Sequence, residues 1–203
     1  SSVYPTVKGA SEVSRPKADL GDGTTGWHFD VVLHNLSDAE VTYEVSSQVL
    51  SEIVDGGFFT EHSSDWRCRG VAVSYSGAAS GVGEGAAVTV PAKGEATIGV
   101  DIAPGSEFAQ YVADNVPSGT FLDGFIRFTS RTETQPSLTV PYLGFYGDWG
   151  KPAIFDALAS DGGAHTFASQ IVNGATGNQL GYNPLIKVGA REGRPNADRY
   201  VIS

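Results

Sequence analysis

The chain has 203 residues, with 13 basic and 23 acidic side chains, and therefore a formal net charge of −10. A negative field of this size repels phosphate backbones, and no Lys/Arg cluster offsets it, which argues against nucleic acid as a partner. A chain of this length buries about 70% of its unfolded surface and can fold without disulfides or metals. The 26 glycines predict many short strands joined by turns.

The sequence contains neither a signal peptide nor an apolar run long enough to cross a membrane. It also contains no methionine, which predicts that it is a piece of a larger protein. Its single cysteine, Cys68, cannot form an intrachain disulfide and is expected to be a small, partly buried side chain.

The first half of the chain predicts extended segments and one hairpin. Residues 3–7 and 13–20 look extended. Between Trp27 and Leu33 every second residue is apolar, which is the period of a half-buried strand. Residues 41–50 alternate in the same way after a short polar joint, and two such strands predict a hairpin.

Residues 55–87 are rich in glycine and serine and predict a long loop. Such a loop is uncommon in a compact domain and is usually functional or mobile. Its aromatic residues are candidates for contact with a neighbouring domain or a substrate: Phe58, Phe59, Trp66 and Tyr75. The alternative, which we favour, is that these rings form a small satellite core that holds the loop down.

The second half predicts further strands and a single helix. Residues 88–90 and 96–102 indicate two strands around a turn. Residues 106–115 predict a helix capped by Ser106. Strands are also predicted over 121–128 and 138–146, and Pro141 places the latter at a sheet edge or where the chain switches sheets, because proline cannot donate a ladder hydrogen bond.

About seven strands with one short crossover helix predict an all-β fold over residues 1–150. The pattern is typical of a β-sandwich of the fibronectin type III or immunoglobulin kind. The core is predicted to contain Trp27, Phe29, Val31, Leu33, Val45, Phe125, Phe128 and Tyr142. Residues 151–203 have a weaker pattern and predict a C-terminal connector to a following domain.

No catalytic or metal-binding motif is recognisable. A serine protease needs a nucleophile, a base and an orienting carboxylate, and none of His28, His34, His62 and His165 lies in such a motif. His28, Asp30 and His34 share the outward face of one strand, but the two histidines lie about 20 Å apart, too far to bind one ion. We therefore expect no catalytic residue, metal or cofactor in this chain.

Three segments resemble one known family. They are residues 29–38, 119–128 and 140–149, and the most specific part is the run Pro-Tyr-Leu-Gly-Phe-Tyr-Gly-Asp at 141–148. Their order and spacing resemble the fibronectin type III-like domain that follows the catalytic domain in cell-envelope subtilisin-family proteases of Gram-positive bacteria. These are the lactocepins and the related peptidases that cleave a complement fragment. The resemblance covers residues 10–156.

The resemblance implies a non-catalytic accessory module of an exported, lactocepin-like serine endopeptidase. Such a module would pack against the catalytic domain of the same polypeptide, space it from the cell wall and help to position protein substrate. The implied location is extracellular and associated with the cell wall. The alternative is an adhesin-type module that binds a host protein or a glycan, and paired exposed aromatics in a groove would favour a glycan.

Overall fold

The structure is a computed structural model that describes residues 2–11, 15–55, 58–66, 70–80, 85–132, 134–151, 171–172, 175 and 179–180. The chain divides into two compact units, Ser1–Lys151 and Pro152–Ser203. In the second unit, β12 (Ile171–Val172) pairs antiparallel with β13 (Gln179–Leu180). Cys68 lies outside the described residues. Within the described part of the chain, no helix is both long and apolar enough to cross a membrane.

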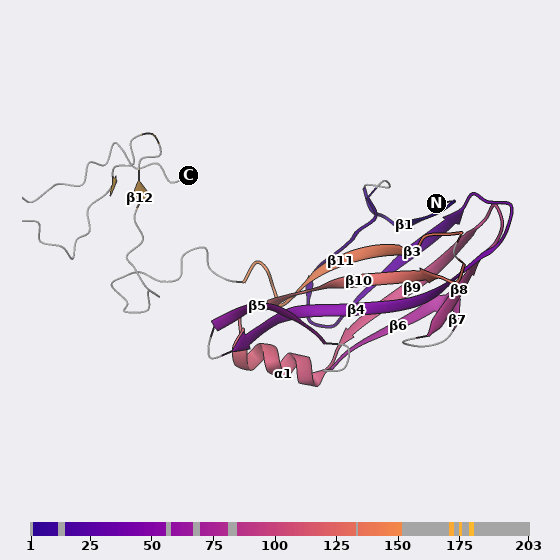
Figure 1. Cartoon of the computed structure of the whole chain (residues 1–203). Coiled ribbons are helices and arrows are strands. Elements are labelled where there is room, and N and C mark those ends of the chain that lie inside the picture. Colours follow the sequence, from indigo (N-terminus) through magenta and orange to yellow (C-terminus); the bar gives the residue numbers. More distant parts are fainter. Residues whose placement is uncertain are drawn as a thin grey trace, which may run out of the picture. The chain divides into compact units, whose positions relative to one another are not determined.

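The first unit is a sandwich of two sheets (Figure 1). The four-stranded sheet has the order β1 (Val3–Val7), β3 (Trp27–Asn35), β9 (Glu95–Pro104), β6 (Val71–Gly77). The seven-stranded sheet has the order β2 (Ala18–Gly23), β11 (Leu138–Tyr146), β10 (Thr120–Ser130), β4 (Val41–Asp55), β8 (Ala86–Val90), β7 (Ala79–Ser80), with β5 (Phe58–Asp65) paired to β4. Among the described strands, every pair is antiparallel except β2–β11, which is parallel. The all-β sandwich is confirmed, with more strands than the sequence indicated.

The predicted long loop over residues 55–87 is wrong, because most of it is strand. β4 continues to Asp55, and β5 turns back along it. The chain then crosses to the other sheet, where β6 pairs with β9, and Val71 and Tyr75 of β6 are buried. Val71, Val73 and Tyr75 recur at period two, so the strand signal was present despite the glycine and serine content.

The core lies between the sheets and is formed by alternate residues of each strand. The predicted core residues Val31, Leu33, Val45 and Phe128 are fully buried. Phe125 is an error in the predicted core: it is half-buried on the outer face, with the Arg127 guanidinium carbon 5.8 Å from its ring centroid. Two residues three positions apart on one strand point to opposite faces, so Phe125 and Phe128 could not both face inward.

Gly124 shows how closely two of the strands approach. A Cβ atom there would meet the Gln48 carbonyl oxygen and the Tyr142 hydroxyl and ring. Without it, the Tyr142 ring passes over β10, and its hydroxyl donates a hydrogen bond to that carbonyl at 2.8 Å. The bond links β11 to β4 across the intervening strand.

The helix α1 (Ser106–Asn115) has the predicted bounds and connects β9 of one sheet to β10 of the other. Gly105 rather than Ser106 is its N-cap, and no side chain among the described residues caps it. Phe108 and Val112 bury the inner side of the helix. β2 begins to pair with β11 at Tyr142. At Pro141, one residue earlier, β11 has β10 as its only neighbour among the described strands.

Candidate binding surfaces

A groove of about 570 Å³ opens beside β2, β10 and β11. We call it the aromatic groove, and it is lined by Asp19, Gly21, Asp22, Phe121, Leu143, Gly144, Phe145, Trp149 and Gly150. Strand register brings these residues together from distant parts of the sequence. Phe145 lies opposite Phe121 on one side and opposite Asp22 on the other.

Three rings form the apolar wall of the aromatic groove. The ring centroids lie 5.4 Å apart for Phe121 and Phe145, 4.9 Å for Phe145 and Trp149, and 5.5 Å for Phe121 and Trp149. These are ordinary distances for tilted and edge-to-face aromatic pairs. Trp149 is nevertheless 63% exposed, Leu143 48% and Phe121 41%. A contiguous group of large exposed apolar side chains indicates an interaction surface.

Hydrogen bonds fix the backbone around Trp149. Its amide N–H donates to Oδ2 of Asp22 at 2.8 Å, and the amide of Gly147 donates to the Gly23 carbonyl at 3.1 Å. Gly147 has φ +147°, and a Cβ atom there would lie 2.9 Å from the Phe145 ring, so a larger residue would disturb the cluster. Trp149 is therefore an exposed side chain on a backbone held in position.

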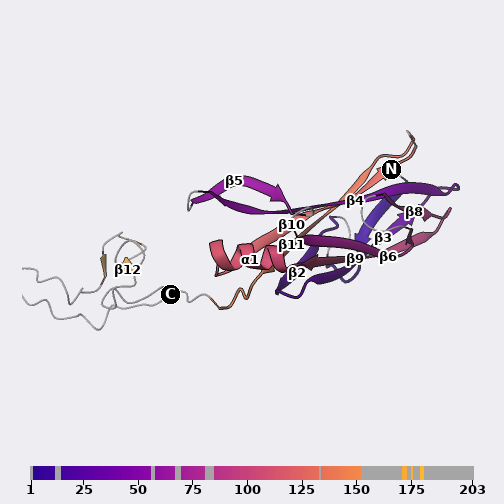
Figure 2. The same ribbon diagram turned by 90° about the horizontal axis from the view of Figure 1, so that it is seen from below.

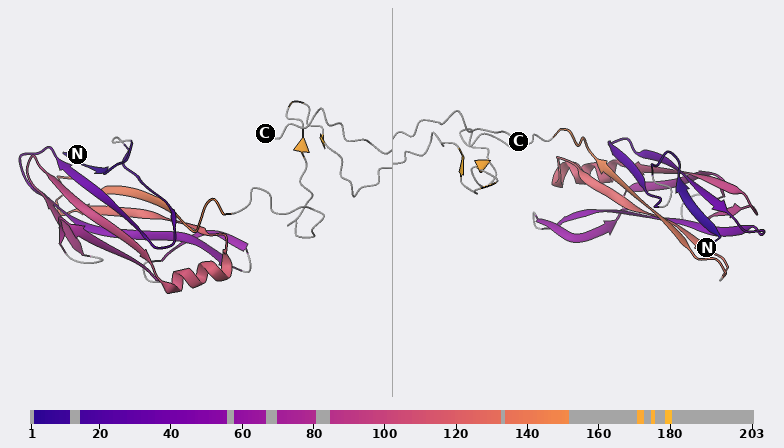
Figure 3. Two further views of the ribbon diagram at one scale, coloured as in Figure 1. Left: turned by 180° about the vertical axis from the view of Figure 1, so that it is seen from behind. Right: turned by 90° about the horizontal axis from the view of Figure 1, so that it is seen from above.

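A second surface is the β4–β5 ribbon, which we define as residues 52–64. The pairing of β4 with β10 ends at Leu50, and beyond it the described part of β4 pairs only with β5. Figures 2 and 3 show this pair of strands extending at the same end of the sandwich as α1. The Tyr111 hydroxyl of α1 accepts a hydrogen bond from the Val54 amide at 2.8 Å and donates to the Glu52 carbonyl at 3.0 Å.

Two of the four aromatic residues predicted as contacts are buried. Trp66 is 3% exposed, with its ring centroid 5.1 Å from that of Phe108 and 4.6 Å from that of Tyr111. Tyr75 is 8% exposed on β6. Phe58 and Phe59 lie on β5, and their side chains are outside the described part of the structure. Trp66 and Tyr75 belong to the main hydrophobic core of the sandwich rather than to a separate satellite core, while a contact role for Phe58 and Phe59 stays a prediction.

The exposed residues of the aromatic groove were not singled out from the sequence, although a signal for two of them existed. Side chains an even number of positions apart on a strand point to the same face. Phe121 therefore shares the outward face of β10 with the polar Arg127, and Leu143 shares the outward face of β11 with the polar Thr139. A large apolar residue in the outward phase of an amphipathic strand marks a candidate contact. Trp149 follows the end of β11, where strand periodicity gives no indication.

The outer face of the four-stranded sheet carries polar side chains. Nδ1 of His28 lies 2.8 Å from Oδ1 of Asp101, and Nε2 lies 3.4 Å from Oδ1 of Asp30. The hydrogen bond to Asp101 and the charge of both carboxylates raise the pKa of His28. With both ring nitrogens directed at carboxylates, the imidazole is stabilised as a cation and is poorly suited to accept a proton from a serine hydroxyl.

The second histidine of this face is also engaged, and it lies apart from the first. Nδ1 of His34 lies 2.7 Å from Oε1 of Glu95, and Nε2 lies 2.9 Å from the Thr6 hydroxyl. Among the described residues, no group of three or more His, Cys, Asp or Glu side chains has a geometry that could hold a metal ion.

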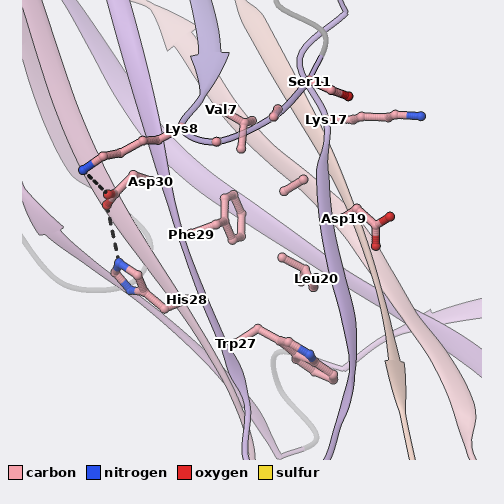
Figure 4. A pocket seen from close by; sticks show the side chains of 13 residues that line it. Val7, Lys8, Ser11, Lys17, Asp19, Leu20, Trp27, His28, Phe29 and Asp30 are labelled. Atoms are coloured by element: carbon pink, nitrogen blue, oxygen red, sulfur yellow. Dashed lines mark hydrogen bonds and ion pairs between the residues drawn. The ribbon is translucent and has the colours of Figure 1, made fainter. Parts of the chain in front are cut away.

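A further pocket of about 710 Å³ lies where β1, β2 and β3 meet. Figure 4 shows Phe29, Leu20 and Trp27 along its middle. On one rim Lys8 and His28 both contact Asp30, each at 3.4 Å, and Lys17 and Asp19 lie on the opposite side. The rims carry both charge signs and the middle is apolar, so the pocket favours no single class of ligand.

Comparison with known proteins places this sandwich in a family. The model of a family described as Fn3-like domain matches residues 19–143. The C5a peptidase of Streptococcus pyogenes serotype M1 is 25% identical over 141 residues, which are 66% of this chain and 10% of that protein. The PII-type proteinase of Lacticaseibacillus paracasei is 26% identical over 178 residues, 83% of this chain and 8% of that protein.

A third relative extends the same pattern. The PIII-type proteinase of Lactococcus lactis subsp. cremoris is 26% identical over 181 residues, which cover 87% of this chain and 8% of that protein. The chain thus spans about a tenth or less of the length of these relatives. The resemblance found in the three sequence segments is confirmed.

Proposed function

Because this chain belongs to the Fn3-like domain family, we propose that it is a non-catalytic accessory module of an exported, subtilisin-like cell-envelope serine endopeptidase. The module packs against the catalytic domain of the same polypeptide and helps to position protein substrate or to space the enzyme from the cell wall. Its location is extracellular and cell-wall-associated. The similarity to a C5a peptidase and to PII- and PIII-type proteinases supports this proposal.

The observation that carries the docking role is the β4–β5 ribbon. A two-stranded ribbon is marginally stable by itself in water, and ordering each residue costs about 1–2 kcal/mol of backbone entropy. The Tyr111 hydroxyl binds the ribbon at Glu52 and Val54, close to where it leaves the sheet. A neighbouring domain that covered the outer part of the ribbon would offset the remaining cost.

Shortening the ribbon tests this role. Deleting residues 56–86 would remove β5, β6 and β7, together with the buried Val71 and Tyr75, and would damage the core. Glu52 and Ser63 are paired, so replacing residues 53–62 by Asn-Gly closes a shorter hairpin with a favourable two-residue turn. In the whole enzyme we expect kcat/KM to fall more for casein than for a chromogenic tetrapeptide, because only an extended substrate reaches past the catalytic cleft.

The matched control is Leu36→Ser, on an exposed turn far from the ribbon in sequence. This substitution should leave kcat/KM unchanged for both casein and the tetrapeptide. Equal losses on casein and tetrapeptide, or none on either, would contradict the docking role. Thermal melting of the shortened chain in isolation separates loss of docking from loss of folding.

The non-catalytic part of the proposal is supported by membership of the Fn3-like domain family and by the geometry of His28, whose ring nitrogens both face carboxylates. Incubation of the isolated chain with casein and a serine-directed fluorophosphonate probe tests it directly. We expect neither labelling nor hydrolysis. Covalent labelling of one serine accompanied by casein cleavage would overturn the assignment.

An adhesin-type module that binds a host protein or a glycan is the second candidate function. The exposed aromatic cluster of Phe121, Phe145 and Trp149 is the observation that favours it. Binding to an immobilised host protein or glycan by the whole chain, lost in Trp149→Ala, would support it. The two functions are distinguishable because the ribbon and the aromatic groove share no residue.

A further inference from the structure

We propose that the aromatic groove binds an extended polypeptide segment in which an arginine or lysine is flanked by apolar residues. The site does not depend on the accessory role in a protease, because its residues lie outside the β4–β5 ribbon. It is assembled from β2, β10, β11 and the segment that follows β11.

The charge of the groove selects a cationic ligand. Its ionisable lining residues are Asp19 and Asp22, and no basic side chain is among the described residues that line it. The side chains Asp19 and Asp22 offer carboxylate oxygens, which accept hydrogen bonds and do not donate them at neutral pH. A guanidinium or ammonium group supplies only donors and a positive charge, so it complements this lining.

The position of Trp149 also favours a cationic ligand. Asp22 accepts the Trp149 backbone amide hydrogen, so a carboxylate and an exposed indole both line the groove on a backbone held in position. Cations are attracted to the face of an indole ring, and arginine also stacks on it. Because the backbone is already positioned, little ordering entropy would be lost when a ligand binds.

The apolar part of the groove points to a polypeptide rather than a sugar. Paired exposed aromatics alone would also suit a glycan, but Leu143 adds an exposed aliphatic side chain next to the rings, which favours a polypeptide with apolar side chains. β2 ends the described order of its sheet, so an extended segment could also pair with its free edge. A second copy of this chain is disfavoured, because it would bring a net charge of −10 to an acidic site.

The test is binding to the whole 203-residue chain, measured by calorimetry and by tryptophan fluorescence. The probe is a terminally blocked peptide of alternating leucine and arginine. Peptides with glutamate in place of arginine, or serine in place of leucine, are the matched controls, and cellohexaose is the saccharide control. We expect the leucine–arginine peptide to bind more tightly than both control peptides and more weakly as salt increases.

The variants locate the site. Trp149→Ala should weaken binding of the leucine–arginine peptide by about tenfold, as expected for an exposed aromatic anchor. Asp19→Asn keeps an oxygen that can accept the Gly21 amide hydrogen and removes one charge, so it should also weaken binding. Asp38→Asn, on the exposed β3–β4 turn, is the charge-matched control and should leave the affinity unchanged.

Leu143→Ser provides a second apolar variant on an exposed side chain, so its folding should be unaffected. The proposal is overturned if the glutamate peptide binds as tightly as the arginine peptide, or if Trp149→Ala and Leu143→Ser leave the affinity unchanged. Equal weakening by Asp19→Asn and Asp38→Asn would show attraction to net charge alone and would also overturn it. Binding of cellohexaose without binding of the peptide would assign the groove to a glycan instead.

Discussion

The outer faces of both sheets carry polar side chains, but the seven-stranded sheet also carries apolar ones where β10 and β11 pair. On the four-stranded sheet, His28, Asp30 and Asp101 form an exposed polar network. On the seven-stranded sheet, Phe121, Phe125 and Leu143 occupy equivalent outward positions. Antiparallel sheets commonly keep one face solvated, as the first does. The apolar group on β10 and β11 departs from that rule in the way expected of a surface that contacts another molecule.

The comparison depends on strand register, and two of the three phenylalanines of β10, Phe125 and Phe128, test it with the largest expected effect. Phe128 is fully buried, and its ring is 6.5 Å from that of Tyr43. Phe128→Ala should lower the free energy of unfolding by roughly 3–5 kcal/mol through lost burial and a cavity. Phe125→Ala removes the same atoms from the outer face and should cost clearly less.

Chemical denaturation of both variants provides the measurement. Similar losses at the two positions would show that the register assigned to β10 is wrong. In that case Phe121, which shares the phase of Phe125, could not be an outward residue either, and the aromatic groove would lose one of its rings.

Asp123 sharpens the comparison because it is a carboxyl group within the apolar face. It lies opposite Leu50 and Leu143 and two positions from Phe121 and Phe125 on its own strand. Burial raises the pKa of Asp123, and the nearby charge of Glu52 adds to the increase. The folded state therefore holds this proton to a higher pH than the unfolded state does, and stability falls as pH rises through the interval between the two pKa values.

Asp123→Asn removes that ionisation. The variant should melt at a higher temperature than the wild-type chain at neutral pH, and the difference should shrink as pH falls below the ordinary range of aspartate. Thermal melts across an acid-to-neutral series measure this. A variant less stable than the wild-type chain at neutral pH would mean that the carboxylate has a favourable role on this face.

His28 gives the smallest expected effect, on the polar face. Its pKa is raised by the hydrogen bond to Asp101, so its contribution to stability is complete below the unfolded pKa and is lost as pH rises through the folded value. His28→Asn should flatten the decline in melting temperature between mildly acidic and mildly alkaline pH. The effect should be small, because the imidazole is largely exposed and solvent screens its ion pairs. An unchanged pH profile of the melting temperature would show that His28 does not contribute to the pH dependence of stability.

Strong periodicity made much of the fold predictable. β3 alternates strictly, and α1 was predicted with its observed bounds because its apolar face and the proline after it both mark a helix. β5 and β6 were missed because their glycine- and serine-rich surroundings outweighed a short alternating pattern. The error at Phe125 came from choosing large side chains without following the two-residue period.

The aromatic groove was beyond sequence reasoning for a different reason. Asp22, Phe121 and Trp149 are far apart in the chain, and they meet because β2 pairs in parallel with β11. A parallel pairing between strands separated by more than a hundred residues has no local signature in the sequence. The alternation of polar and apolar residues along β10 and β11 could have identified Phe121 and Leu143 as individual exposed apolar residues. It could not have identified the groove that they line.

The central claim is that the β4–β5 ribbon docks on a neighbouring domain, and amide hydrogen exchange tests it most directly. Exchange of residues 52–64 should be compared between the 203-residue chain alone and the same segment within the longer polypeptide proposed above. We expect exchange to slow by about tenfold or more in the longer polypeptide, because docking suppresses local opening of the ribbon. Amides on β3, which lies in the other sheet, should exchange equally in both and serve as the internal reference. Equal exchange of the ribbon in the two proteins would contradict the account.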